Sequence, residues 1–173
     1  MSGFFLVSEK SFEIGDIVRL GERVGTVYSI DLLSIKIRTF DNLLIRVPNQ
    51  TVISTELTNI TRFPVRRMDF QISVAYKEDL PKVNEILLQI CRENPLCLDE
   101  PEPLILFQKF GNSGIEILLG VWFEKLNFVE IKNSMFKAIK KKFDEEGIEI
   151  PFPHVTLYTG KETLPFPVIS KKN

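Results

Sequence analysis

The sequence has little of the chemistry on which most enzymes and metal proteins depend. Its 173 residues include two cysteines and one histidine. Cys91 and Cys97 form no Cys-x-x-Cys motif and have no histidine at ligand spacing, so we interpret them as two reduced thiols. His154, between Pro153 and Val155, has no cysteine, aspartate or glutamate partner at ligand spacing. That isolation favours a structural or exposed histidine over a catalytic one.

Long apolar runs are also missing. The longest, Ile115 to Phe123, is interrupted by Glu116 and is far shorter than the ~18 apolar residues that a membrane-spanning helix needs. The apolar segment Gly3 to Val7 is too short for the core of a secretory signal and lacks a basic flank. The sequence therefore predicts a chain that is soluble by itself and cannot form a pore alone.

No excess of either charge is present. The 22 Lys and Arg residues nearly balance the 23 Asp and Glu residues, and the balance holds on both sides of residue 65. Binding to a phosphate backbone usually needs a net positive field, so no nucleic-acid partner is expected. No nucleophile–base pair, carboxylate dyad or metal-ligand cluster stands out. We therefore expect no enzyme, no catalytic residue, no metal and no cofactor.

What the sequence does contain, between residues 16 and 62, is a run of short strands. We expect strands over 16–20, 24–30, 35–39, 43–47 and 57–61. The third alternates apolar and polar residues, as a half-buried strand does. Asp41-Asn42 supplies a hairpin turn, because both residues tolerate left-handed backbone angles. No helix of useful length fits among these strands, and the tight turns predict a small bent barrel.

After Pro64 the pattern changes to mixed α and β. Strands are expected over 68–75, 104–110 and 115–123, with Gly111 to Gly114 as a hairpin rather than a phosphate loop. Asp79 is the expected N-cap of a helix that ends at Asn94-Pro95, and a second amphipathic helix covers 127–146. A short strand, Val155 to Tyr158, follows. The order β-α-β-β-α-β is the split βαβ arrangement.

These patterns predict two domains, and the first is small. A barrel of about 50 residues buries only ~60% of its unfolded surface, so it needs a neighbour or an oligomer. Most of the fourteen phenylalanines are expected at core positions. Phe4, Phe5 and Phe12 precede the first strand with little domain to bury them, which suggests a segment that was cut away from, or docks onto, something apolar. Lys140 to Lys142 are expected on a solvated helix face, with a lipid-headgroup contact as the lesser alternative.

Several segments, taken in order, resemble the small-conductance mechanosensitive channel (MscS) family. Residues 10–18 resemble the family's P-F-x-x-G-D-x-V entry to its β domain, with Ser11 where proline is usual. Residues 38–49 are similar to its R-T-x-D … I-x-V-P-N stretch, and residues 59–67 to its N-x-S/T-R-x-P-x-R-R junction. Further similar segments are Val24–Val27, Val74–Tyr76, Gly114, Trp122 and Gly147–Pro153.

The resemblance, over roughly residues 3 to 158, implies an Sm-like β domain, a ferredoxin-like α+β domain and a strand of a small axial barrel. The expected segments are a pore-helix remnant (1–11), the β domain (12–64), the α+β domain (65–153), the axial strand (154–160) and a flexible tail (161–173). In the family several copies, typically seven, form a hollow cage with side openings beneath a tension-gated pore. The implied partners are a homo-oligomeric ring, the inner membrane, whose cytoplasmic side the cage faces, and ions and small solutes.

Family members carry membrane helices before this region, so the chain is expected to be either an excised fragment or a short natural product. The matched motifs supply structural candidates: Phe12, Gly15, Asp16, Gly25, Pro48, Asn49 and Asn59. Glycines 15, 25 and 114 are expected in turns or close packing, and Asn49 is expected to bond its own backbone. Arg62, Arg66 and Arg67 are candidates either for lining a side opening or for salt bridges to the neighbouring domain. For Arg66 and Arg67, a further alternative is that they tie subunits together. Two alternative functions stay open, a soluble Sm-like RNA-binding protein and an interaction scaffold.

Overall fold

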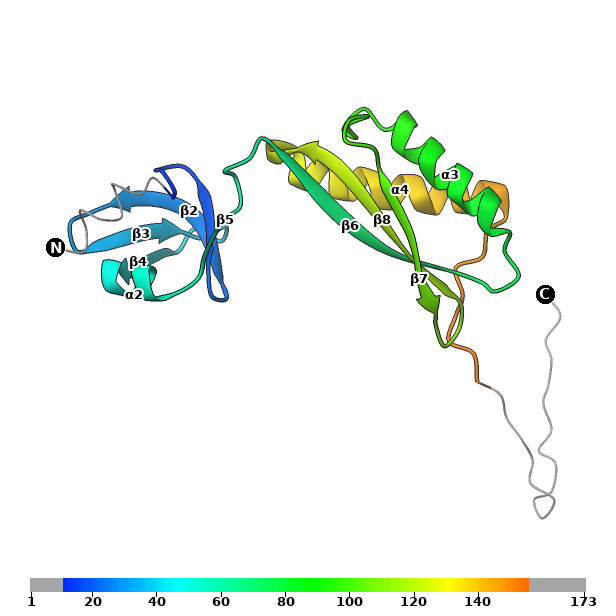
Figure 1. The fold of residues 1–173 in the computed structure, drawn as a ribbon, viewed down its shortest axis with the longest axis horizontal. Coiled ribbons are helices and arrows are strands. Elements are labelled where there is room, and N and C mark those ends of the chain that lie inside the picture. The colour runs from blue at the N-terminus through cyan, green and yellow to red at the C-terminus, as the bar shows by residue number, and fades with distance from the viewer. Residues whose placement is uncertain (1–10, 156–173) are drawn as a thin grey trace, which may run out of the picture. The chain divides into compact units, whose positions relative to one another are not determined.

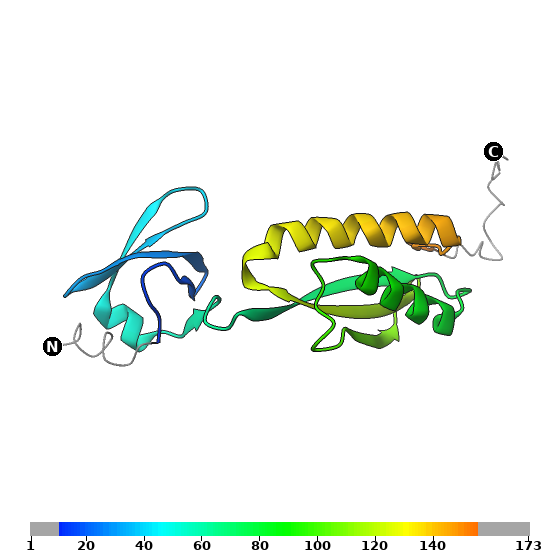
Figure 2. The same cartoon turned by 90° about the horizontal axis from the view of Figure 1, so that it is seen from above.

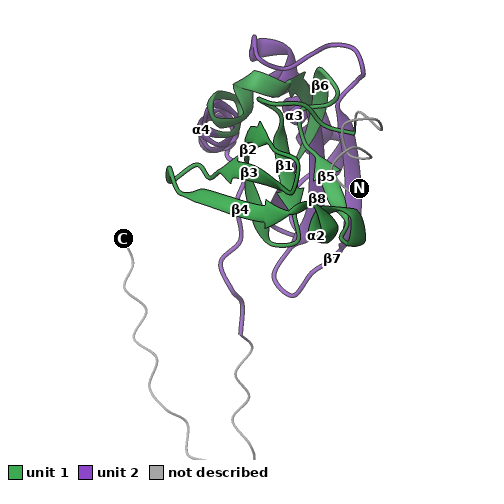
Figure 3. Cartoon of the chain, turned by 90° about the vertical axis from the view of Figure 1, so that its left-hand side faces the viewer, with its two compact units in different colours: residues 1–68, 122–132 green, residues 69–121, 133–173 purple. Residues whose placement is uncertain are grey.

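The chain divides into two compact units. The computed structural model describes residues 11–155. Unit 1 comprises Met1–Met68 with Trp122–Lys132, and unit 2 comprises Asp69–Val121 with Asn133–Asn173 (Figure 3). Three elements, over residues 65–74, 115–124 and 128–146, contribute residues to both units, so the units are not consecutive in sequence.

Unit 1 is built on a five-stranded antiparallel sheet. Its strands are β1 (Ile17–Leu20), β2 (Arg23–Ile30), β3 (Ser34–Arg38), β4 (Leu44–Pro48) and β5 (Leu57–Asn59), in the order β4-β3-β2-β1-β5 (Figure 1). Asn42, in the β3–β4 hairpin, has a φ of 66°, which is the left-handed angle that the turn sequence predicts. The pairing of β2 with β3 shifts between Val27 and Ser29. A bulge of this kind increases strand bending, which suits a small curved sheet. The expected Sm-like β domain is confirmed.

The core of unit 1 gathers the alternate apolar residues of its strands. Its fully packed members are Phe12, Val18, Leu20, Val27, Ile35, Ile37, Val47 and Val52. Phe12 is only 4% exposed, so the expectation that the β domain could not bury it is wrong. Although Phe12 precedes β1 in sequence, its side chain belongs to the core that β1 helps to form.

A short helix that the sequence did not predict joins β4 to β5. This helix, α2 (Asn49–Ser54), has six residues and buries Val52 in the core. Six residues give fewer than two helical turns, which is too short for a 3.6-residue period to be visible in the sequence.

Unit 2 has the order β-α-β-β-α. Its elements are β6 (Val65–Val74), α3 (Leu80–Glu93), β7 (Leu104–Phe110), β8 (Ile115–Glu124) and α4 (Phe128–Glu146). Of these, β6, β8 and α4 extend into unit 1, where a 3-10 helix (Lys125–Asn127) joins β8 to α4. The sheet order is β6-β8-β7, and α3 and α4 run alongside it (Figure 2). Alternate residues of β8 are buried, and so are the apolar stripes of α3 and α4. Asp79 occupies the predicted N-cap position without a side-chain capping bond. The split βαβ order up to α4 is confirmed.

Several expectations fall at the ends of the chain. Val155, the last described residue, is not in a strand, and the rest of the predicted strand Val155–Tyr158 lies outside the described residues. The same is true of residues 1–10 of the pore-helix remnant and of the tail after residue 160. Across residues 11–155, no helix has both the length and the apolar character needed to cross a bilayer.

The phenylalanines differ from expectation. Only Phe12, Phe70, Phe123 and Phe143 of the described phenylalanines are buried. The exposed ones are Phe40, Phe63, Phe107, Phe110, Phe128, Phe136 and Phe152. The expectation that most of them occupy core positions is therefore wrong. Apolar side chains are expected to be covered by other apolar groups, but the chain itself leaves many of its phenylalanines uncovered.

Candidate functional site

A polar cluster ties the start of β1 to the segment that follows β5. Asp16 accepts hydrogen bonds from the Glu13 backbone N–H (2.9 Å), Asn59 Nδ2 (2.8 Å) and the Thr61 hydroxyl (3.1 Å). The Thr61 hydroxyl in turn accepts a bond from the Ile17 N–H at 2.9 Å. We call Asp16, Asn59 and Thr61 the Asp16 clamp, because together they hold two segments more than 40 residues apart in sequence.

Asn59 uses both ends of its amide in the clamp. Its Nδ2 donates to the Ser11 carbonyl at 3.1 Å as well as to Asp16, and its Oδ1 accepts from the Thr61 N–H at 3.1 Å. The structure therefore brings together two residues of the sequence-based set, Asp16 and Asn59. Thr61, which is buried, was not in that set although it lies in the same matched motif. A small polar residue two positions after Asn59 was the available signal.

The clamp controls the charge state of Asp16. Burial alone would raise the pKa of this carboxyl group. The Glu13 N–H, the Asn59 and Thr61 side chains and the charge of Lys125 act in the opposite direction, and the pKa is lowered from its ordinary value. Asp16 is therefore an anion at neutral pH, and its charge is shared among the donors that surround it.

Two predicted glycines have separate structural reasons. Gly15 has a φ of +97° and donates its N–H to the Val27 carbonyl at 2.9 Å. Gly25 lies where β2 approaches β3, and a Cβ there would lie 2.5 Å from the Arg38 carbonyl oxygen and 2.7 Å from Ile37 Cγ2. The first position needs a backbone angle that other residues rarely adopt, and the second needs the absence of a side chain.

Asn49 acts differently from the expectation that it bonds its own backbone. Pro48 ends β4, and Asn49 opens α2 while being only 2% exposed. Its Nδ2 donates to the carbonyls of Asp31 (3.1 Å) and Leu32 (2.9 Å), in the turn between β2 and β3. Asn49 thus fastens a distant turn to the start of the helix, and the local prediction was wrong.

A cavity of about 410 Å³ opens on the same unit. Its cationic lining residues are Arg19 of β1, Arg66 of β6 and Lys125 of the 3-10 helix, and none of its lining residues is acidic. The remaining wall is apolar and includes Ile17, Phe128 and other residues of β2 and α4. We call it the Arg66 cavity.

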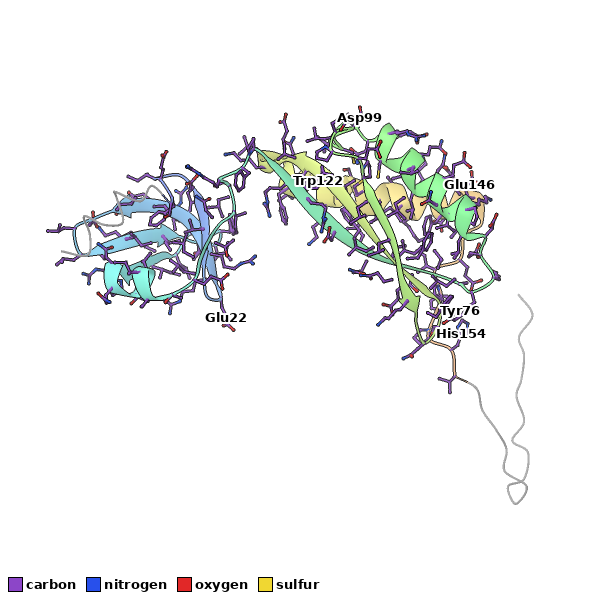
Figure 4. All side chains as sticks on the ribbon, viewed as in Figure 1. Glu22, Tyr76, Asp99, Trp122, Glu146 and His154 are labelled. Carbon is purple, nitrogen blue, oxygen red and sulfur yellow. The ribbon has the colours of Figure 1, made fainter. Side chains whose placement is uncertain are left out.

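The three arginines of the junction do not form one cluster. Successive residues of a strand face opposite sides, and β6 separates Arg66 from Arg67 in this way. The Arg66 Cζ lies 5.7 Å and 5.3 Å from the ring centroids of Phe123 and Phe128. The Arg67 Cζ lies 5.9 Å from the ring centroid of Trp122, a residue labelled in Figure 4. Arg62 is exposed in the connection to β6.

Lys125 connects the clamp to the cavity. Its backbone N–H donates to the Pro64 carbonyl at 2.9 Å, and its Nζ donates to the Thr61 carbonyl at 2.7 Å. The same ammonium group lowers the pKa of Asp16. Arg66, by contrast, has a pKa lowered by burial and by the charge of Arg19. Sequence analysis identified Arg66 but neither Arg19 nor Lys125, because the partners of Lys125 lie about sixty residues away in the chain.

The other candidates have ordinary surroundings. His154 is exposed, and its backbone N–H donates to the Ser113 hydroxyl in the β7–β8 hairpin. The Tyr76 hydroxyl donates to the Gly111 carbonyl in the same hairpin (Figure 4). Lys140 and Lys141 pair with acidic residues one helical turn further on, as a solvated face does. Within the described part of the chain, no group of His, Cys, Asp and Glu residues is arranged to hold a metal ion.

Comparison with known proteins assigns the two parts of the chain to one family. The family described as "Mechanosensitive ion channel, beta-domain" matches residues 1–62, and "Mechanosensitive ion channel MscS, C-terminal" matches residues 68–150. The chain belongs to the MscS family. A protein of Archaeoglobus fulgidus described as an uncharacterized MscS family protein is 34% identical over 162 residues, which are 94% of this chain and 57% of the relative.

Two further relatives agree. The small-conductance mechanosensitive channel MscMJ of Methanocaldococcus jannaschii is 28% identical, over 94% of this chain and 47% of that protein. The crystal structure of Helicobacter pylori MscS in its closed state has the same fold, with a TM-score of 0.88 at 22% identity over 93% of this chain and 64% of that one. This MscS-family chain thus spans about half the length of the curated relatives it matches.

Proposed function

We propose that this chain forms the cytoplasmic vestibule, or cage, of an MscS-type mechanosensitive channel, where it supports assembly and sieves solutes during tension-gated ion efflux. The observation that carries the proposal is the match of both parts of the chain, in order, to the β-domain and C-terminal models of the family. A role in architecture is supported by the clamp and the close strand packing of unit 1, which hold segments distant in sequence together.

Assembly with further copies is supported by the apolar surface that the chain leaves uncovered. In unit 2, β7 is an edge strand of its sheet, and Leu104, Leu106 and Phe110 of this strand are exposed. Edge strands with apolar side chains are usually covered by a partner. We propose that the partner is another copy of the chain and that the copies close into a ring, a heptamer as in the family.

The sieving role is assigned to the exposed arginines of the junction. Arg62 and Arg67 are both exposed on unit 1, so their charges can act on ions that pass the cage wall. In the full-length channel this region would lie on the cytoplasmic side of the inner membrane, and ions and small solutes would be the passing species. The alternative reading of these arginines, ties between neighbouring parts of the ring, is separated from sieving by the experiment below.

The proposal is tested with a chimera. Residues 1–173 replace the matching region of MscMJ, and the fusion is expressed in a bacterium without mechanosensitive channels. We expect survival of hypo-osmotic shock and tension-gated currents in membrane patches. A chimera that reaches the membrane as an oligomer but conducts nothing under tension would contradict the channel role. The isolated chain should form a large homo-oligomer in native mass spectrometry.

Charge variants of the same chimera test the sieve. Arg62→Gln with Arg67→Gln should change the relative permeability of anions and cations without changing the amount of ring. Lys140→Gln with Lys141→Gln is the matched control, because those lysines are exposed on α4 and paired within their own helix. A loss of ring with unchanged permeability in the remaining channels would assign the arginines to subunit contacts instead.

A further inference from the structure

The Arg66 cavity combines positive charge with an apolar wall. It brings together β1, β2, the start of β6, the 3-10 helix and the first turn of α4, all within unit 1. Its volume of about 410 Å³ falls in the range of roughly 300–1,000 Å³ that small-molecule sites occupy. A cavity of this size that carries only one sign of charge needs a physical explanation.

The charges of the cavity are not neutralised by the residues that form it. Arg19 and Arg66 lie close enough for their charges to repel, and burial further disfavours the charged form of Arg66. None of the cavity's lining residues is Asp or Glu. The first turn of α4 adds the partial positive charge of a helix N-terminus. Two like charges beside an apolar wall repel each other, and a bound anion would remove this repulsion.

Two of the three cationic groups are held in place before any ligand arrives. Arg66 lies over the rings of Phe123 and Phe128, and Lys125 is fixed by its bond to the Thr61 carbonyl, which uses one of its three N–H donors. A guanidinium group binds a carboxylate or phosphate through two parallel hydrogen bonds. Groups that are already ordered lose little freedom on binding, which favours affinity.

The rest of the cavity suits a hydrocarbon chain. Phe40, Leu126 and Val129 border it, and their side chains are largely exposed. Aliphatic and aromatic side chains that stay exposed around a cavity gain free energy when an apolar ligand covers them. A purely hydrophilic anion would satisfy the arginines but would leave this wall uncovered.

We propose that the Arg66 cavity binds a single-chain anionic amphiphile, whose carboxylate or phosphate head pairs with Arg19, Arg66 and Lys125 while its alkyl chain lies along the apolar wall. This inference is independent of the channel role. It commits to a single-chain ligand because the cavity has the volume of one small molecule.

The test measures binding of four probes to the full chain by isothermal titration calorimetry: decanoate, decyl phosphate, decanol and acetate. Decanoate or decyl phosphate should bind at least about tenfold more tightly than decanol, which lacks the charge, and than acetate, which lacks the chain. Added salt should weaken binding of the anions and leave that of decanol unchanged. Equal binding of decanol and decanoate would overturn the proposal, since it would show that the cations play no part.

Two variants of neighbouring residues locate the site. Arg66→Gln should weaken decanoate binding at least about tenfold, whereas Arg67→Gln, on the opposite face of the same strand, should leave it unchanged. Arg19→Gln reports on the same cavity from β1 and keeps the test decisive if Arg66→Gln fails to fold. Equal affinities for the wild-type chain and a folded Arg66→Gln or Arg19→Gln variant would refute the assignment.

Two further measurements distinguish the source of the ligand. Co-sedimentation with phosphatidylcholine vesicles that contain lysophosphatidylglycerol, an anionic lipid with one acyl chain, but not with phosphatidylcholine vesicles alone, lost in Arg66→Gln, would indicate a single-chain membrane lipid. Binding of decanoate without co-sedimentation would indicate a free fatty acid, and both results support an anionic amphiphile. If the wild-type chain binds none of the probes and Arg66→Gln dissociates its homo-oligomer, the cavity accepts an acidic segment of a second copy and the proposal is wrong.

Discussion

Replacing Asp16 with asparagine should destabilise unit 1 by an amount that depends on pH. The carboxylate accepts from the Glu13 N–H, from Asn59 and from Thr61, at 2.8 to 3.1 Å. Hydrogen bonds to a charged group contribute about 1.5–3 kcal/mol each, against about 0.5–1.5 kcal/mol for neutral ones. Asparagine removes the charge and turns an NH2 group towards at least one donor.

The expected loss at neutral pH is about 2–3 kcal/mol, taken from the low end of these ranges because solvent reaches part of the carboxyl group. For a unit of this size a loss of about 2 kcal/mol lowers the melting temperature by roughly 8–16 °C. Asp31→Asn is the matched control. Asp31 pairs with Lys36 at 3.0 Å on the surface of the same unit, and exposed pairs of this kind contribute at most about 1 kcal/mol.

The pH dependence separates the role of charge from that of shape. The pKa of Asp16 is lower in the folded than in the unfolded chain, so its stabilising effect is complete above the unfolded pKa of ~3.9 and is lost as the pH falls through the folded pKa. The free-energy gap between the wild type and Asp16→Asn should therefore shrink in acid.

Urea denaturation over a pH series measures this gap, and hydrogen exchange in β1 and β5 shows that the loss is local. The reasoning is refuted if Asp16→Asn unfolds at the wild-type urea concentration at neutral pH. It is also refuted if the gap between the two proteins is the same at neutral pH and in strong acid.

Three further outcomes are expected. Gly25→Ala should cost about 1–3 kcal/mol in urea denaturation, because the new methyl group would lie 2.5 Å from a carbonyl oxygen of β3; unchanged stability would mean that the strands separate without cost. Phe12→Ala should lower the free energy of unfolding by about 3–5 kcal/mol, whereas Phe63→Ala, at an exposed residue, should change it by no more than about 0.5 kcal/mol. Equal losses in the two variants would contradict the burial of Phe12. Iodoacetamide should label Cys97 before Cys91 at mildly alkaline pH, which mass spectrometry can follow. The reason is that the hydrogen bond between the two thiols lowers the pKa of Cys97, whereas this bond and burial raise the pKa of Cys91. The reverse order of labelling would be inconsistent with this bond.

The strands and long helices were predictable because each repeats a local pattern over enough residues. In β3, Ile35 and Ile37 are buried while Arg38 is exposed, as the alternation indicates. The buried positions of α3 follow the predicted stripe for the same reason. The helix α2 was missed because its six residues contain only one buried apolar side chain, Val52, which defines no period.

The functional residues were predictable only where a matched motif joined distant segments. Asp16 and Asn59 were named from the family resemblance, and the structure places them 2.8 Å apart. No local pattern indicates that Asn49 bonds the turn between β2 and β3, or that Lys125 bonds Thr61. Contacts over such separations depend on how the sheet and the helix ends meet, which local periodicity does not encode.

Because successive side chains of β6 face opposite sides, the two proposals can be tested with different arginine variants. Arg66 and Arg67 are adjacent in sequence and were treated as one candidate pair, yet Arg66 lines the cavity beside Phe128 while Arg67 lies against Trp122. If the cavity binds an anion, neutralising Arg66 changes affinity for decanoate without changing ion permeability. If the cage wall selects ions, neutralising Arg67 does the reverse. A single arginine whose loss changed both would mean that ligand binding and ion passage are coupled in this strand.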